Sequence, residues 1–185
     1  MSRLRYLLMS MPPPVVCRQI DVLLQQLHLA PALRTLLVKP ANLHQSLSDR
    51  YWPDELPDVE QRLRRALAQL QAHKVTMTLN WISGHEGYAS LKPRGMPTGF
   101  QALLDTIRLA LEAQGLKASA SNTPHITLSY LTSLSPDAIE IAPIEWTIDR
   151  ILLVKSDGDG EKYRYEELQS QQLLDAPLES QQGLF

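Results

Sequence analysis

The most constraining feature of this 185-residue sequence is a short motif that occurs twice. The segments "LHQSLS" (43–48) and "PHITLS" (124–129) share the pattern His-x-(Ser/Thr)-Leu-Ser. Side chains of a β-strand alternate between two faces, so a strand over the first segment directs His44 and Ser46 to one face and its leucines to the other. The motif therefore predicts a strand that packs leucines in a core and presents an imidazole and a hydroxyl on the opposite face.

The second motif repeats this arrangement in the other half of the chain. His125 and Thr127 share one face of their strand, as His44 and Ser46 do. A single segment of this kind is typical of the polar side of a half-buried sheet, and short motifs recur by chance. Two matching segments, each with a helix pattern nearby, instead indicate two related lobes that face each other across a cleft.

A pair of histidines across a cleft is suited to acid–base chemistry. Imidazole titrates near neutral pH, so one ring can act as a general base while the other acts as a general acid. The hydroxyls of Ser46 and Thr127 can donate hydrogen bonds to phosphate oxygens, which gain negative charge during phosphoester attack. The set lacks the His-x-x-x-His and carboxylate spacing of familiar zinc sites, so we expect no metal and no other cofactor.

The remaining sequence mixes helix and strand patterns with hairpins. Thr98 is a plausible N-cap and Gly115 a stop for one helix, while "DGDGEK" has the composition of a hairpin turn. This mixture predicts an α+β fold with antiparallel sheets rather than a doubly wound parallel sheet. Strands are expected over 3–11, 35–49 with an interruption at Pro40 and Asn42, 74–83, 124–130 and 144–156, and helices over 15–29, 56–72 and 98–114.

Composition limits the class of protein and its surroundings. The chain is 44% hydrophobic and 21% charged with a net charge of −2, so it is globular and carries no global basic footprint for duplex nucleic acid. Cys17 is the only cysteine, which excludes an intrachain disulfide. No apolar run is long enough to span a membrane. We expect a cytoplasmic monomer with one bilobal domain over 1–175 and a flexible tail over 176–185.

The two motifs resemble those of the two-histidine phosphoesterase superfamily, and within it the bacterial 2′-5′ RNA ligase-like proteins, also called RNA 2′,3′-cyclic phosphodiesterases. The resemblance covers roughly residues 3 to 175, because the first strand, both motifs and the segment "IEWTIDRILLVKS" follow in the order that the family uses. It implies a bilobal α+β fold with a pseudo-twofold axis, antiparallel sheets lining a central cleft and helices outside.

The reaction that this resemblance implies is metal-independent opening of a 2′,3′-cyclic phosphate at an RNA end to a phosphomonoester. Reversible 2′-5′ ligation is a side activity of some members. The implied catalytic residues are His44 and His125, and the implied phosphate-binding residues are Ser46 and Thr127. We assign the activation of water to His125 and the protonation of the departing ribose oxygen to His44; the opposite assignment is chemically equivalent at this level.

Two positions depart from the commoner family pattern: Ser46 stands where threonine is commoner, and Tyr130 keeps other substrates open. Many members have arginine where this chain has Tyr130, which is therefore an accessory candidate at the site. Tyr130 and the modest charge make small cyclic nucleotides or ADP-ribose cyclic phosphate alternative substrates, and a non-catalytic RNA-end-binding module is a further alternative.

Other residues are candidates for contacts with a base or a phosphate. Three aromatic side chains could stack on a base, although a core or surface packing role is expected for each: Tyr51, Trp52 and Tyr88. The cations considered for phosphate contacts are Arg3, Arg5, Lys39, Arg50, Lys92, Arg94 and Lys155.

Overall fold

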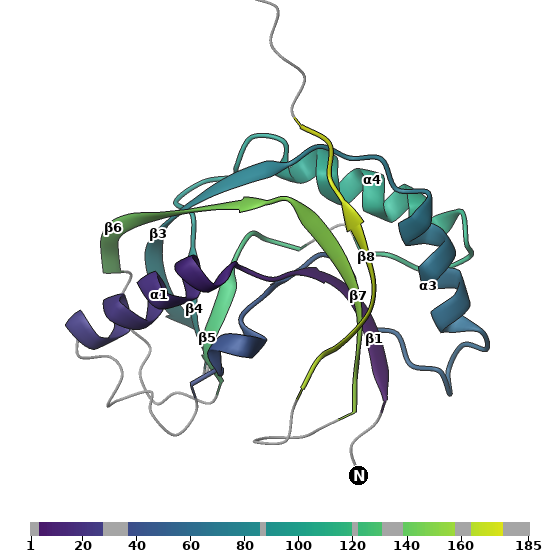
Figure 1. The fold of residues 1–185 in the computed structure, drawn as a ribbon, viewed down its shortest axis with the longest axis horizontal. Helices are drawn as coiled ribbons and strands as arrows, with labels where there is room; N and C mark the ends of the chain where they lie inside the picture. The colour runs from purple at the N-terminus through teal and green to yellow at the C-terminus, as the bar shows by residue number, and fades with distance from the viewer. Residues whose placement is uncertain are drawn as a thin grey trace, which may run out of the picture.

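A computed structural model describes the chain over residues 4–27, 37–85, 88–119, 122–130, 139–157 and 164–175. In these ranges the chain forms two four-stranded antiparallel sheets and three α-helices, which confirms the α+β class (Figure 1). The expected tail over 176–185 lies outside the described residues, as does the "DGDGEK" turn apart from its first residue.

The first sheet has the order β2-β1-β7-β8. Its strands are β1 (Arg5–Ser10), β2 (Gln45–Ser46), β7 (Arg150–Ser156) and β8 (Glu166–Gln172). The expected hairpin partner of β7 is confirmed, because β7 and β8 pair antiparallel. The short strand β2, which contains part of the first motif, forms one edge of this sheet.

The second sheet has the order β5-β4-β3-β6. Its strands are β3 (Val75–His85), β4 (Tyr88–Lys92), β5 (Ile126–Tyr130) and β6 (Ile139–Ile148). The second motif forms β5 at an edge of this sheet. The two motifs therefore lie on edge strands of different sheets.

The strand expected over 144–156 is in fact divided between the two sheets. The chain leaves β6 after Ile148 and enters β7 at Arg150, and Figure 1 shows the green ribbon bending between them. β6 pairs with β3, whereas β7 pairs with β1 and β8. The prediction of one strand was wrong because alternation along a sequence reports burial but not a change of pairing partner.

The three helices are shorter than expected and begin at different residues. They are α1 (Pro14–Gln26), α3 (Val59–Ala68) and α4 (Phe100–Glu112). Pro14 suits the first position of α1, where its missing N–H is not needed. Thr98 is not the N-cap of α4: Gly99 occupies that position with φ of 81°, a left-handed conformation that glycine adopts without strain. Gly115, with φ of 70°, follows the end of α4 as expected.

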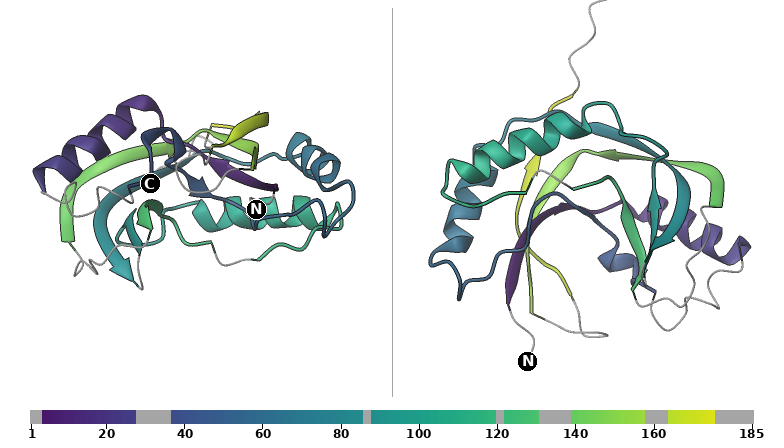
Figure 2. Two further views of the ribbon diagram at one scale, coloured as in Figure 1. Left: turned by 90° about the horizontal axis from the view of Figure 1, so that it is seen from below. Right: turned by 180° about the vertical axis from the view of Figure 1, so that it is seen from behind.

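One hydrophobic core joins both sheets to the helices. α1 packs on β6, while α3 packs on β7, β8 and α4, so helices cover opposite ends of the molecule (Figures 1 and 2). The leucines of both motifs lie in this core, which confirms the expected inward face of each motif strand. The motif side chains in the core are Leu43, Leu47, Ile126 and Leu128. None of the described helices has the length and apolar character needed to cross a bilayer.

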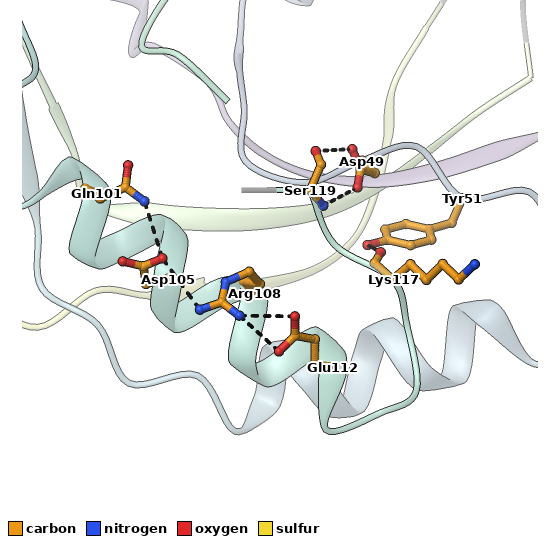
Figure 3. A network of polar contacts seen from close by, with 8 residues as sticks. All are labelled: Asp49, Tyr51, Gln101, Asp105, Arg108, Glu112, Lys117 and Ser119. Carbon is orange, nitrogen blue, oxygen red and sulfur yellow. Dashed lines mark hydrogen bonds and ion pairs between the residues drawn. The ribbon is translucent and has the colours of Figure 1, made fainter. Parts of the chain in front are cut away.

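Polar contacts tie the segment after β2 to the segment before β5 (Figure 3). The Asp49 carboxylate accepts hydrogen bonds from the backbone N–H and the hydroxyl of Ser119, at 2.6 and 2.7 Å. The hydroxyl of Tyr51 donates to the carbonyl of Lys117 at 2.7 Å. Tyr51 is also held to β1 by two main-chain hydrogen bonds with Tyr6. These contacts join the chain around one motif to the chain that leads into the other.

The Tyr51 hydroxyl should contribute measurably to stability. Tyr51 is buried, so Tyr51→Phe leaves the Lys117 carbonyl without this donor and should lower the free energy of unfolding by about 1 kcal/mol. Tyr51→Ala also removes the buried ring and should lower it by about 3–5 kcal/mol. Urea denaturation measures both changes. The exposed Tyr88 is the matched control, and equal effects of Tyr51→Phe and Tyr88→Phe would contradict this role of the hydroxyl.

Candidate active site

A cavity of about 220 Å³ brings together the five side chains that the sequence predicted at the site, namely the two motif histidines, the two motif hydroxyls and Tyr130. They come from the two edge strands and the residues next to them, since His44 precedes β2 and His125 precedes β5. Arg50 and Tyr88 complete the lining. The cavity is therefore lined by His44, Ser46, Arg50, Tyr88, His125, Thr127 and Tyr130.

Both imidazoles are oriented by the same local hydrogen bond. Nδ1 of His44 lies 2.7 Å from the carbonyl of Asn42, and Nδ1 of His125 lies 2.9 Å from the carbonyl of Thr123. A carbonyl only accepts hydrogen bonds, so Nδ1 carries the proton in each ring. Nε2 is then the nitrogen left for chemistry, with a lone pair when the ring is neutral. The two motifs are therefore alike both in sequence and in the orientation of their histidine rings.

Burial keeps His44 neutral in the free protein. The side chain is 9% exposed, and this desolvation lowers the pKa of His44 from 6.5 to about 4. The hydrogen bond with Asn42 acts in the opposite direction, while the positive charge of Arg50 adds to the lowering. At neutral pH, Nε2 of His44 is therefore a proton acceptor.

Tyr165, immediately before β8, packs against His44 and was not anticipated from the sequence. Its ring meets the imidazole edge to face, with 5.0 Å between ring centroids and 72° between planes. Its hydroxyl lies 3.4 Å from Nε2 of His44, a long hydrogen bond. Nothing in the segment "YRYEEL" marks this contact, because it depends on β8 returning beside β7.

The other polar groups of the cavity match a phosphate. The side chains of Ser46 and Thr127 have no hydrogen-bond partner among the described residues, so both hydroxyls are available to a ligand. Arg50 adds a permanent positive charge. No group of three His, Cys, Asp or Glu side chains that could hold a metal ion occurs in the described ranges.

Most of the other cations considered lie elsewhere. Of those that the structure describes, Arg50 alone lines the cavity. Lys155 is paired with Glu166 at 3.0 Å, and Arg94 lies 5.2 Å from the Trp81 ring. Arg3 lies outside the described residues. Spacing along the chain could not distinguish Arg50 from these alternatives.

Two tyrosines form an aromatic rim on the cavity. Tyr88 and Tyr130 are directly paired across β4 and β5, and they are 41% and 47% exposed. Tyr88 is therefore not a core residue, and the register of the β4–β5 pair places it beside Tyr130 at the site. Tyr51, another aromatic candidate for stacking on a base, is buried and bonded to Lys117.

Solved structures with the same fold were identified by comparison. E. coli LigT in its apo form superposes with a TM-score of 0.73 at 21% identity, covering 94% of this chain and 99% of LigT. LigT complexed with 3′-AMP gives a TM-score of 0.71 at 21% identity and the same coverage. TT0787 of Thermus thermophilus gives 0.66 at 23% identity, covering 91% of this chain and 97% of that protein. At these identities the likeness establishes the fold.

The sequence provides the family assignment. No curated protein matches the chain by sequence. The family model described as the 2′-5′ RNA ligase superfamily, however, matches residues 12–160, a range that contains both motifs and every residue lining the cavity. With this match and the two-sheet fold shared with LigT, the chain belongs to the 2′-5′ RNA ligase superfamily.

Proposed function

We propose that the protein is a phosphodiesterase that opens 2′,3′-cyclic phosphates at RNA ends to phosphomonoesters by acid–base catalysis of His44 and His125. The observation that carries the proposal is the matched pair of imidazoles. Each donates from Nδ1 to a carbonyl, which leaves Nε2 as the nitrogen for chemistry, and both line one cavity with two available hydroxyls. Phosphate binding alone would be better served by arginine than by two titratable rings.

The ionisation of His44 favours it as the general base. Because His44 is neutral at pH 7, its Nε2 takes a proton from water as the water oxygen bonds to phosphorus. His125 in its protonated form then donates the Nε2 proton to the ribose oxygen as its bond to phosphorus breaks. The sequence alone gave the base role to His125 and the acid role to His44, although either assignment was chemically equivalent at that level. The proposed mechanism exchanges the two roles.

Hydroxyls and a guanidinium support the charge that develops on phosphate. Ser46 and Thr127 donate to the non-bridging oxygens, and Arg50 offsets their negative charge. The long bond between Tyr165 and Nε2 of His44 is weak, so water can replace the phenol there. After turnover, His44 holds an extra proton and His125 lacks one, and exchange with solvent restores the starting state.

The dimensions of the site suggest which part of the substrate enters. A volume of about 220 Å³ is below the roughly 300–1,000 Å³ of pockets that enclose drug-sized ligands. We infer that the cyclic phosphate and ribose enter this volume and that the base lies against the rim of Tyr88 and Tyr130. Solved structures of E. coli LigT include complexes with phosphate, 3′-AMP, ATP and NADP+, which supports a nucleotide ligand.

Small cyclic nucleotides or ADP-ribose cyclic phosphate are the second candidate substrates. Arg50 is the one lysine or arginine among the described lining residues, and the family resemblance implies an arginine where this chain has Tyr130. Each additional RNA phosphate would normally be contacted by lysine or arginine. A substrate with a single cyclic phosphate and an aromatic base needs no such contacts.

Removing either imidazole should abolish most of the activity. With chelator present, His44→Ala and His125→Ala should each lower kcat by about 10²–10⁴-fold, the usual contribution of a general acid or base. The assay compares a 2′,3′-cyclic phosphate RNA oligonucleotide with small cyclic nucleotides. His73→Ala is the control, because His73 is an exposed histidine bonded to the Asp175 carbonyl.

Three outcomes of that assay would count against the proposal. If the wild-type protein opens neither substrate, the protein is not this phosphodiesterase. If His44→Ala or His125→Ala retains the wild-type rate, that imidazole is not catalytic. If hydrolysis depends on an added divalent metal, acid–base catalysis by the two rings alone is insufficient.

The pH dependence should report the burial of His44. If His44 is the base, activity requires its neutral form, so kcat/KM falls as pH decreases through about 4. Tyr165→Ala exposes the ring to water and should move this acidic limb upward, toward the ordinary histidine pKa of about 6.5. Tyr165→Phe keeps the ring covered and should leave the limb near its wild-type position. A fall in kcat/KM as pH rises through about 4, the pKa of His44 itself, would instead assign His44 as the acid.

The aromatic rim should matter for substrates that carry a base. Stacking on an aromatic side chain contributes about 1–3 kcal/mol per base, so Tyr130→Ala should raise KM by about 5- to 150-fold. Tyr130→Phe retains the ring and should have little effect. Ribose 2′,3′-cyclic phosphate, which lacks a base, is the control substrate. An equal rise in KM for this substrate would show that Tyr130 does not bind the base.

A further inference from the structure

Gln45 is a buried polar residue between the two first-motif residues that line the cavity. Its side chain is 0% exposed, whereas those of His44 and Ser46 reach the cavity. Gln45 pairs with Ser10 of β1 at the edge of the first sheet. Because strand side chains alternate, Gln45 points to the opposite side of β2 from its two neighbours. Gln45 does not line the cavity, so its side chain does not contact a substrate bound there.

The amide of Gln45 bonds to both motifs. Its Nε2 donates to the carbonyl of Ser46 at 2.8 Å and to the carbonyl of Thr123 at 3.2 Å. Its Oε1 accepts the backbone N–H of His125 at 2.6 Å. The two carbonyls require a donor and the N–H requires an acceptor, so chemistry determines the orientation of the amide. Gln45 is consequently satisfied without water.

These bonds act on both parts of His125 that decide where its ring lies. One holds the backbone nitrogen of His125 directly. The other holds the carbonyl of Thr123, which also accepts the hydrogen bond from Nδ1 of His125. A side chain of the first motif is therefore bonded both to the backbone N–H of His125 and to the carbonyl that orients its ring.

No equivalent link runs in the other direction among the described residues. Ile126 occupies the position of the second motif that Gln45 occupies in the first, and it packs in the hydrophobic core. Within the same part of the chain, no main-chain hydrogen bond joins 43–47 directly to 122–127. Nearby main-chain pairing connects Val38 to Leu128 instead. Gln45 thus provides the hydrogen bonds between the two motif segments themselves.

We propose that Gln45 is a positioning residue that holds His125 in place relative to His44 across the two sheets. The proposal rests on the proposed function, because it concerns the geometry of the same two imidazoles. A displacement of about 1 Å at a reacting group can lower a rate by about 100-fold. Gln45 therefore affects the rate without touching substrate.

The principal variant is Gln45→Met, which keeps a similar length and removes all three hydrogen bonds. It should lower kcat by about 10- to 100-fold and leave KM within about twofold, because the residues that bind phosphate remain in place. Gln45→Glu keeps an acceptor for the His125 N–H and should fall between Gln45→Met and wild type. The matched control is Ile126→Val, which should lower Tm and leave kcat unchanged.

Nitrogen NMR of the His125 ring separates positioning from general stability. In the wild type the neutral ring should be protonated at Nδ1, and in Gln45→Met it should become a mixture of tautomers. If Gln45→Met lowers Tm but changes neither kcat nor the tautomer, Gln45 is merely structural and the proposal is wrong. Should the variants not fold, hydrogen exchange of wild-type protein decides: a His125 amide that exchanges as fast as an unprotected one overturns the proposal.

The activity, tautomer and exchange measurements together distinguish failure of the proposed function from failure of the proposed role of Gln45. If the wild type opens no cyclic phosphate, the proposed function is wrong, but the tautomer and exchange measurements still test the link from Gln45 to His125. If the wild type is active and Gln45→Met retains full activity and tautomer, the function stands and the role of Gln45 is refuted.

Discussion

The site depends on the contact between two sheets, because each sheet supplies one histidine. β2 and β5 are edge strands, and neither could present a pair of imidazoles alone. The shared hydrophobic core brings the sheets together, with apolar residues of both motifs buried in it. Hydrogen bonds donated by Ser119 to Asp49, and exchanged by Gln45 with Thr123 and His125, then join the chain around one motif to the chain around the other. The alternation of each strand thus connects core formation with the assembly of the cavity.

The two halves of the site are alike in hydrogen bonding but differ in environment. Both Nδ1 atoms face a carbonyl two residues earlier, yet in the part of the chain that the structure describes a tyrosine ring packs edge to face on His44 alone. Burial of the His44 side chain keeps its pKa low. A pseudo-symmetric arrangement can therefore supply chemically different groups, which acid–base catalysis requires.

Much of the architecture was predictable because it depends on local patterns. The alternation in both motifs indicated the inward leucines, and the helical periodicity indicated α1, α3 and α4. The predicted bounds of elements were wrong where strand pairing or local backbone conformation, rather than residue type, decides where an element begins or ends. The division at Asp149 reflects two different sheets, and the N-cap at Gly99 reflects the local backbone conformation rather than the preference of Thr98 for that position.

The sequence by itself determined the pair of His-x-(Ser/Thr) motifs, the face on which each histidine lies and the α+β class, since these follow from a period of two residues and from residue type. Only the tertiary structure decided which additional groups meet the histidines. Tyr88 and Tyr165 reach the site through strand register and chain return, and Gln45 reaches His125 across two sheets. Such contacts join residues far apart in the chain, so no local pattern of side chains encodes them.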